Sequence, residues 1–156
     1  MQVLPKHGPC FVCGSPNSPS MGVTWYANDD QTIFAEVTLN DAQQGPPGFA
    51  HGGASAALLD EAMGAAVWLA GYRVASVNLN ISYRKPVPLG QPFKVTAQVN
   101  ERNGKKVTAV GEIRLADGTL AVSGEGVFVQ APQLFNGLGA GSRSADEAME
   151  IRETEK

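Results

Sequence analysis

The hydrophobic pattern changes character twice along the chain. Residues 53 to 69 are almost all apolar or small and contain no proline, which predicts a helix of about four turns that is buried on most of its circumference. The flanking segments are rich in β-branched and aromatic residues, which is typical of strands. Strands are predicted at residues 22–27 and 32–38 before the helix, and at 74–84, 92–101, 105–116 and 119–130 after it.

Turn residues separate these segments. Asn103-Gly104 and Asp117-Gly118 predict two tight hairpins, and Gly71 is placed to end the helix. A helix that is apolar all round needs more than one flat contact. The order β-β-α-β-β-β-β therefore favours an α+β fold, in which a curved antiparallel sheet of about six strands wraps around one long central helix.

Composition suggests where this domain begins and ends. The 156 residues suffice for one domain. Residues 1–21 hold four prolines and predict an irregular N-terminal lead-in, and the domain itself is expected over residues 22–131. Residues 132–156 lose the alternation and predict a C-terminal tail, either mobile or ending in a frayed helix.

Charge and hydropathy exclude several classes of protein. The net charge of -3 argues against a protein built around nucleic-acid phosphates. The N-terminus lacks the apolar core of a signal peptide, and the most apolar stretch carries Asp60 and Glu61 at its centre, where charges are costly in lipid. We therefore expect a cytoplasmic protein that binds neither nucleic acid nor membrane.

A lone CxxC motif lies in the lead-in. His7 precedes Cys10 and Cys13 at the same spacing, so three metal ligands are present, but a structural zinc site generally has four and no second CxxC or HxxxH follows. The favoured interpretation is a reduced cysteine pair in a tight turn, with zinc binding or redox chemistry as the alternative. No GxGxxG or P-loop is present in strand–turn–helix context, so neither metal nor cofactor is predicted.

Candidate chemistry gathers on the predicted helix. Gly52 and Gly53 lie at its start, where backbone N–H groups have no partner inside the helix and can polarise a negative oxygen. Asp60 and Glu61 lie in its middle, where an ionised carboxylate is costly to bury unless it is paired or functional. Helix neighbours point about 100° apart, so one carboxylate is expected to face the site. A purely structural Asp60, held by backbone donors or by Arg73, is the alternative.

The motifs around this helix resemble a known family. The run HGGASAALLDEAMG at residues 51–64, the preceding QGPPG and the following SVNLNISYRKPV are similar to the PaaI-like, phenylacetate-pathway branch of the hotdog-fold acyl-CoA thioesterases. The resemblance covers about residues 20 to 130 and extends to the N-terminal CFVCG. It implies a hotdog fold, hydrolysis of an acyl- or aryl-CoA thioester to free acid and CoA, and a homodimer or homotetramer.

The same resemblance implies roles for particular residues. The Gly52 N–H would polarise the thioester carbonyl, and Asp60 would act as general base on water or as nucleophile. These two residues are eight positions apart on one helix, roughly 12 Å, so the site should be completed across a dimer. His51 resembles a loop histidine that shapes the turn more often than it transfers protons.

Weaker candidates surround this pair. Gln44 would orient substrate or water, although some relatives carry that residue at the position of Gly45. Ser76 matches a strand hydroxyl that positions water, but strict alternation places it on the polar face of its strand, away from the helix. Further substrate contacts are expected from Gly53, Glu61 and Phe49, and contacts with CoA phosphates from Arg84, Lys85, Arg102 and Lys105. Charged hairpin tips are otherwise simply solvated.

Two other functions remain open on this fold. A hydratase or dehydratase is expected to use a histidine together with an acid, and the chain has two histidines, His7 and His51. A non-catalytic acyl-CoA sensor is expected to lose the acid, whereas Asp60 is present. The site residues therefore favour thioester hydrolysis, since the fold alone does not decide.

Overall fold

The computed structural model describes residues 1–15 and 19–136. The strands are β1 (Gln2–Val3), β2 (Tyr26–Ala27), β3 (Ile33–Val37), β4 (Val74–Tyr83), β5 (Phe93–Asn103), β6 (Lys106–Leu115) and β7 (Leu120–Gln130). The helices are the 3-10 turn η1 (Asp41–Gln43), the long helix α1 (Gly52–Leu69) and the short α2 (Gln133–Asn136). Most of the predicted C-terminal tail, residues 137–156, lies outside the described residues.

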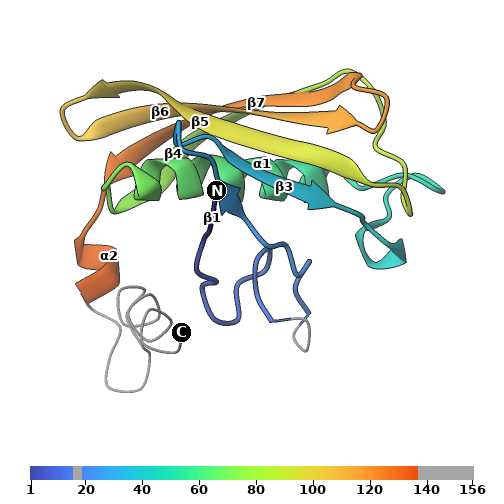
Figure 1. The fold of residues 1–156 in the computed structure, drawn as a ribbon, viewed down its shortest axis with the longest axis horizontal. Helices are drawn as coiled ribbons and strands as arrows, with labels where there is room; N and C mark the ends of the chain where they lie inside the picture. Colours follow the sequence, from blue (N-terminus) through green and yellow to red (C-terminus); the bar gives the residue numbers. More distant parts are fainter. Residues whose placement is uncertain (16–18, 137–156) are drawn as a thin grey trace.

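One curved antiparallel sheet wraps around α1, as Figure 1 shows, and this confirms the predicted fold class. The strand order is β1-β2-β3-β5-β6-β7-β4, so the described sheet has seven strands rather than about six. β4 follows the helix in sequence but pairs with β7, which places β4 at the far edge of the sheet. The other side of β4 has no partner strand within the described chain.

The lead-in contributes to the domain, and this explains the additional strand. β1 pairs with β2, and the Leu4 N–H donates to the Trp25 carbonyl over 2.9 Å. The Val23 N–H donates to the Val12 carbonyl over 3.0 Å. The backbone before β2 is therefore bonded to the lead-in, which is why β2 is shorter than the predicted strand 22–27. Cys13 is buried among the core side chains.

Helix α1 buries one stripe against its own sheet. The buried positions recur in pairs every four residues, which is the spacing that keeps side chains on one face of a helix: Ala54, Ser55, Leu58, Leu59, Ala62, Met63, Ala66 and Val67. The opposite face, which includes Asp60, Glu61 and Gly64, is only half-buried. Burial on most of the circumference is thus wrong for this chain alone, and a partly open helix face carries both carboxylates.

The turns match the sequence pattern. Gly104 and Gly118 adopt φ angles of 59° and 86° in the two hairpins. Both values lie in the left-handed region that glycine adopts at little cost.

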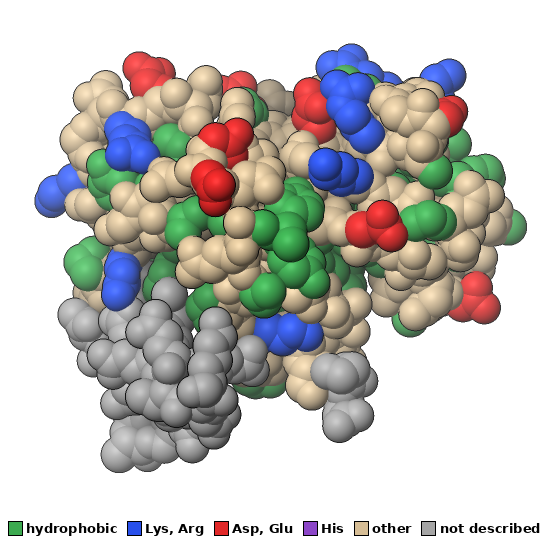
Figure 2. All heavy atoms as spheres, in the orientation of Figure 1, with side chains coloured by type: hydrophobic (Ala, Val, Ile, Leu, Met, Phe, Trp, Pro, Cys, Tyr) green, Lys and Arg blue, Asp and Glu red, His purple; other side chains and the backbone are tan. Residues whose placement is uncertain are grey.

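No helix among the described residues is long and apolar enough to cross a membrane. Figure 2 shows basic and acidic side chains interspersed on the face it presents.

Candidate active site

The start of α1 presents one available backbone donor. His51 is the N-cap residue, and its Nδ1 accepts a hydrogen bond from the Gly53 N–H over 2.9 Å. The Ala54 N–H donates to the His51 carbonyl. Within the described part of the chain, the Gly52 N–H has no such acceptor. Of the two predicted glycine donors, Gly52 is therefore the one available to a ligand, because His51 occupies Gly53.

Tyr83, at the end of β4, closes over this helix start. Its hydroxyl donates to the Gly52 carbonyl over 2.7 Å. A Cβ added at Gly52 would lie 3.3 Å from the Tyr83 Cζ and hydroxyl oxygen, so the ring would have to move by a few tenths of an ångström to admit a side chain there. The sequence pattern does not predict this contact. The two residues are 31 positions apart, so no local pattern points to it.

The loop before α1 is held by its own side chains. The Gln44 Oε1 accepts a hydrogen bond from the Gly48 N–H over 3.0 Å, and the Gln44 backbone bridges Ala50. A Cβ at Gly45 would lie 2.8 Å from the His51 Cα, so this loop conformation leaves no room for a side chain there. The side-chain oxygen of Gln44 is thus engaged within the loop. Gly45 has no side chain that could orient substrate or water in its place.

Asp60 is paired with a strand hydroxyl of the same chain. The Ser76 Oγ donates to the Asp60 Oδ1 over 2.7 Å. If side chains alternated strictly along β4, Ser76 and Tyr83 would point to opposite faces of the strand. The pairing of β4 with β7 shifts register between Ser76 and Asn78, so a β-bulge inserts one extra residue and brings Ser76 to the helix side.

Glu61 points to a different set of groups. Its Oε1 lies 3.1 Å from the His7 Nδ1 and accepts from the Cys10 thiol over 3.5 Å. A cavity of about 120 Å³ is lined by both carboxylates, His7 and Ser76. The structure therefore places Asp60 and Ser76 together and directs Glu61 to the lead-in, so that neighbouring acids have separate partners.

Hydrogen bonds within this lead-in cluster shift its pKa values. Contacts with Cys10 first, and then with Glu61, raise the pKa of His7 to about 9. The hydrogen bond from the Cys13 thiol lowers the pKa of Cys10 to about 3, and the same contact raises the pKa of Cys13. The contact between the two cysteines thus moves their pKa values in opposite directions.

The candidate cations separate into two groups. Arg84 and Lys85 line a hollow of about 350 Å³ together with Gly52 and Tyr83. Arg102 instead lies over the Tyr72 ring, with its Cζ 5.5 Å from the ring centroid. Arg102 and Lys105 belong to the β5–β6 hairpin, at the end of the sheet where Lys106 pairs with Val129, whereas Tyr83 pairs with Val122 at the other end. Phe49 is partly exposed in the loop before α1, where it bridges Pro88.

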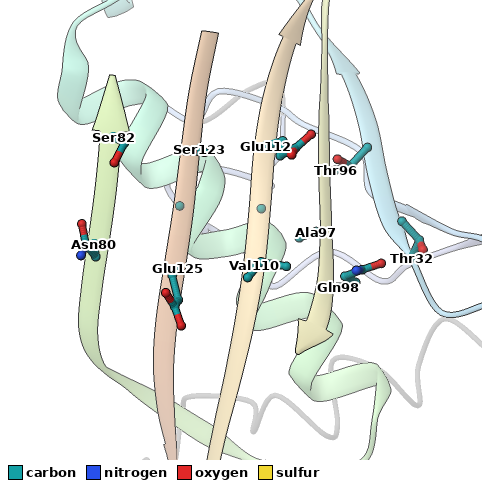
Figure 3. Close-up of a pocket in the computed structure, with 12 residues that line it drawn as sticks. Thr32, Asn80, Ser82, Thr96, Ala97, Gln98, Val110, Glu112, Ser123 and Glu125 are labelled. Atoms are coloured by element: carbon teal, nitrogen blue, oxygen red, sulfur yellow. The ribbon is translucent and has the colours of Figure 1, made fainter. Parts of the chain in front are cut away.

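A larger hollow lies on the opposite face of the sheet. Figure 3 shows it across β4, β7, β6 and β5, and its volume is about 600 Å³. Its lining is mostly polar and includes the carboxylates Glu112 and Glu125. Neither Asp60 nor Gly52 lines it. The acidic lining suits neither an apolar acyl chain nor phosphates, so the candidate active site is the helix side of β4.

Comparison with known proteins relates these features to a family. Residues 47–122 match the thioesterase superfamily model. The chain is 40% identical over 78 residues to acyl-coenzyme A thioesterase THEM4 of Xenopus laevis, a match covering 49% of this chain and 35% of that protein. It is 35% identical over 104 residues to THEM4 of Bos taurus, covering 66% and 43%. The matches thus cover less than half the length of these relatives.

Solved structures agree with the sequence comparison. A crystal structure of a thioesterase superfamily protein is 39% identical, with a TM-score of 0.73 over 80% of this chain and 63% of the other. The PaaI protein of E. coli is 19% identical, with a TM-score of 0.66 over 71% and 80%, and thus shares the fold. On sequence and structure together, the chain carries a domain with the hotdog fold that is similar to proteins of the thioesterase superfamily.

Proposed function

We propose that the protein hydrolyses acyl-CoA thioesters at a site shared by two copies of the chain. The observation that carries this proposal is the attachment of both site residues to one edge strand. Gly52 is bonded to Tyr83 at one end of β4, and Asp60 is bonded to Ser76 near the other. The curated relatives are named acyl-coenzyme A thioesterases, which supports the substrate class.

The edge of β4 is suited to pair with a second copy. Val77, Leu79 and Tyr83 are 59%, 38% and 55% exposed, which is a large apolar exposure for an unpaired edge strand. Antiparallel pairing of β4 with its copy about a twofold axis near Leu79 and Asn80 would set Tyr83 of one copy beside Ser76 of the other. Gly52 and the second copy's Asp60 would then approach one carbonyl.

Each group has a defined task in this arrangement. The thioester carbonyl oxygen accepts a hydrogen bond from the Gly52 N–H, at the positive end of α1. Asp60 either takes a proton from water as the water oxygen attacks the carbonyl carbon, or attacks that carbon itself to form an anhydride that water hydrolyses. In both cases the C–S bond breaks, CoA leaves as its thiolate and the acyl group leaves as the free acid.

Subunit mixing tests this shared site. Gly52→Pro removes the N–H, and Asp60→Asn removes the carboxylate, so each variant alone should release little free thiol from acyl-CoA. A mixed dimer contains one intact pair, so mixing equal amounts with subunit exchange should restore about a quarter of wild-type activity. If the separate variants are inactive and mixing restores nothing after demonstrated exchange, the shared site is wrong.

Three further assays, of thiol release, acyl-CoA binding and enoyl-CoA hydration, separate hydrolysis from the other functions of this fold. Free-thiol release from a panel of aryl, short and medium acyl-CoAs should detect at least one substrate. Binding without thiol release would favour an acyl-CoA sensor. Hydration of an enoyl-CoA without thiol release would favour a hydratase. Sedimentation of the native protein would distinguish a dimer from a tetramer.

A further inference from the structure

Four potential metal ligands converge at the junction of the lead-in and α1. His7, Cys10, Cys13 and Glu61 each offer one ligand atom, and all four atoms lie within 4.8 Å of one another. Glu61 is 54 residues from His7, so the fold and not the local motif brings the fourth ligand to the other three. The sequence interpretation lacked that ligand when it favoured a reduced cysteine pair.

The distances within the cluster fit one tetrahedral ion. Zinc bonds of about 2.0–2.1 Å to nitrogen and oxygen and about 2.3 Å to sulfur place N···O pairs about 3.4 Å apart, and S···N or S···O pairs about 3.6 Å apart. The corresponding separations are 3.1 Å for His7 and Glu61, 3.4 Å for Cys13 and His7, and 3.5 Å for Cys10 and Glu61.

Hydrogen bonding alone accounts poorly for this convergence. The His7 Nδ1 faces both the Glu61 carboxylate and the Cys13 sulfur, yet a ring nitrogen carries at most one proton. The turn that carries the cysteines is also tightly fixed. The Gly14 N–H donates to the Cys10 carbonyl over 2.9 Å, and a Cβ at Gly14 would lie 2.3 Å from that oxygen. Both sulfur atoms lie within 4.8 Å of a carboxylate oxygen of Glu61 on α1.

We propose that His7, Cys10, Cys13 and Glu61 bind one zinc ion that fastens the lead-in to helix α1. Two sulfur ligands with an imidazole and a carboxylate favour zinc over the oxygen-preferring cations. All four positions come from the protein, which is the pattern of structural rather than catalytic zinc. Two of the ligands, His7 and Glu61, line the same cavity as Asp60, so the ion would also stabilise one wall of the candidate active site.

The neighbouring carboxylates allow a crossed test. The native protein, purified with a thiol-free reductant, should contain about one zinc per chain by elemental analysis. Glu61→Gln and Cys10→Ser should each reduce zinc at least tenfold under matched purification, whereas Asp60→Asn and His51→Asn should keep it. Metal content is measured without any catalysis. A negative zinc result would therefore leave the proposed hydrolysis standing, and a negative thiol-release result would leave the zinc proposal standing.

Cobalt supplies a readout that does not depend on the variants. Co²⁺ added to metal-stripped native protein should produce the thiolate-to-cobalt charge-transfer bands of a tetrahedral site with sulfur ligands, and one equivalent of Zn²⁺ should abolish them. Metal stripping should also lower the Tm. Native protein with both thiols free that neither contains zinc nor gives these bands would overturn the proposal. Full zinc retention in both Glu61→Gln and Cys10→Ser would overturn the four-ligand site.

Discussion

The Ser76 hydroxyl donates a hydrogen bond of 2.7 Å to the Asp60 carboxylate within a single chain. The bond engages one carboxylate oxygen, Oδ1, and fixes the orientation of the group. Oδ2 can then face a water molecule or an acyl carbon. The contact depends on the β-bulge after Ser76, because an unbroken strand would turn that hydroxyl to the outer face.

Ser76→Ala should therefore lower kcat about tenfold with little change in KM, because the carboxylate is still present but less well oriented. Asp60→Asn should lose about a hundredfold or more while staying folded. Ser82→Ala is the matched control, since Ser82 lies on the same strand but lines the outer hollow, and it should leave both constants unchanged. Equal kcat for Ser76→Ala and wild type would contradict a positioning role.

The second prediction concerns the backbone donor at the start of α1. Gly52 is the first helical residue and follows an extended His51, so proline can replace it without breaking the helix. Gly52→Pro should lower kcat about a hundredfold by deleting one oxyanion donor. Gly52→Ala places a similar Cβ against Tyr83 but keeps the N–H, and should retain most of the activity. Equal losses in the two variants would assign the effect to crowding.

Sequence patterns predicted the fold because its determinants are local. The run of apolar and small residues without a proline located α1 to within one residue, and Asn-Gly and Asp-Gly placed both hairpins. Glycine spacing and the mid-helix acid likewise identified Gly52 and Asp60 as candidates. What the sequence missed depends on contacts between distant segments. Three features arise only when sheet and helix pack together: the bulge that turns Ser76 towards the helix, the hydrogen bond between Tyr83 and Gly52, and the contact between Glu61 and His7.

A third prediction separates capping by His51 from proton transfer. His51 caps α1 by accepting from the Gly53 N–H, a task that asparagine also performs. His51→Ala should lower the free energy of unfolding by about 1 kcal/mol and reduce activity with it, as measured by denaturant unfolding and thiol release. His51→Asn should restore both. Restored stability with activity still lost would instead make His51 a proton-transfer residue.

The last prediction concerns recognition of the CoA phosphates. Arg84 and Lys85 line the same hollow as Gly52, at the end of β4 where the thioester would lie. Removing one phosphate contact typically costs about 1.5–3 kcal/mol, so Arg84→Ala should raise KM for acyl-CoA at least about tenfold with a smaller change in kcat. The same variant should behave like wild type towards an acyl-pantetheine, which lacks the phosphates. Arg114→Ala is the charge-matched control, because Arg114 is paired with Glu112 away from this hollow. An equal rise in KM for both substrates would show that Arg84 shapes the pocket rather than binding phosphate.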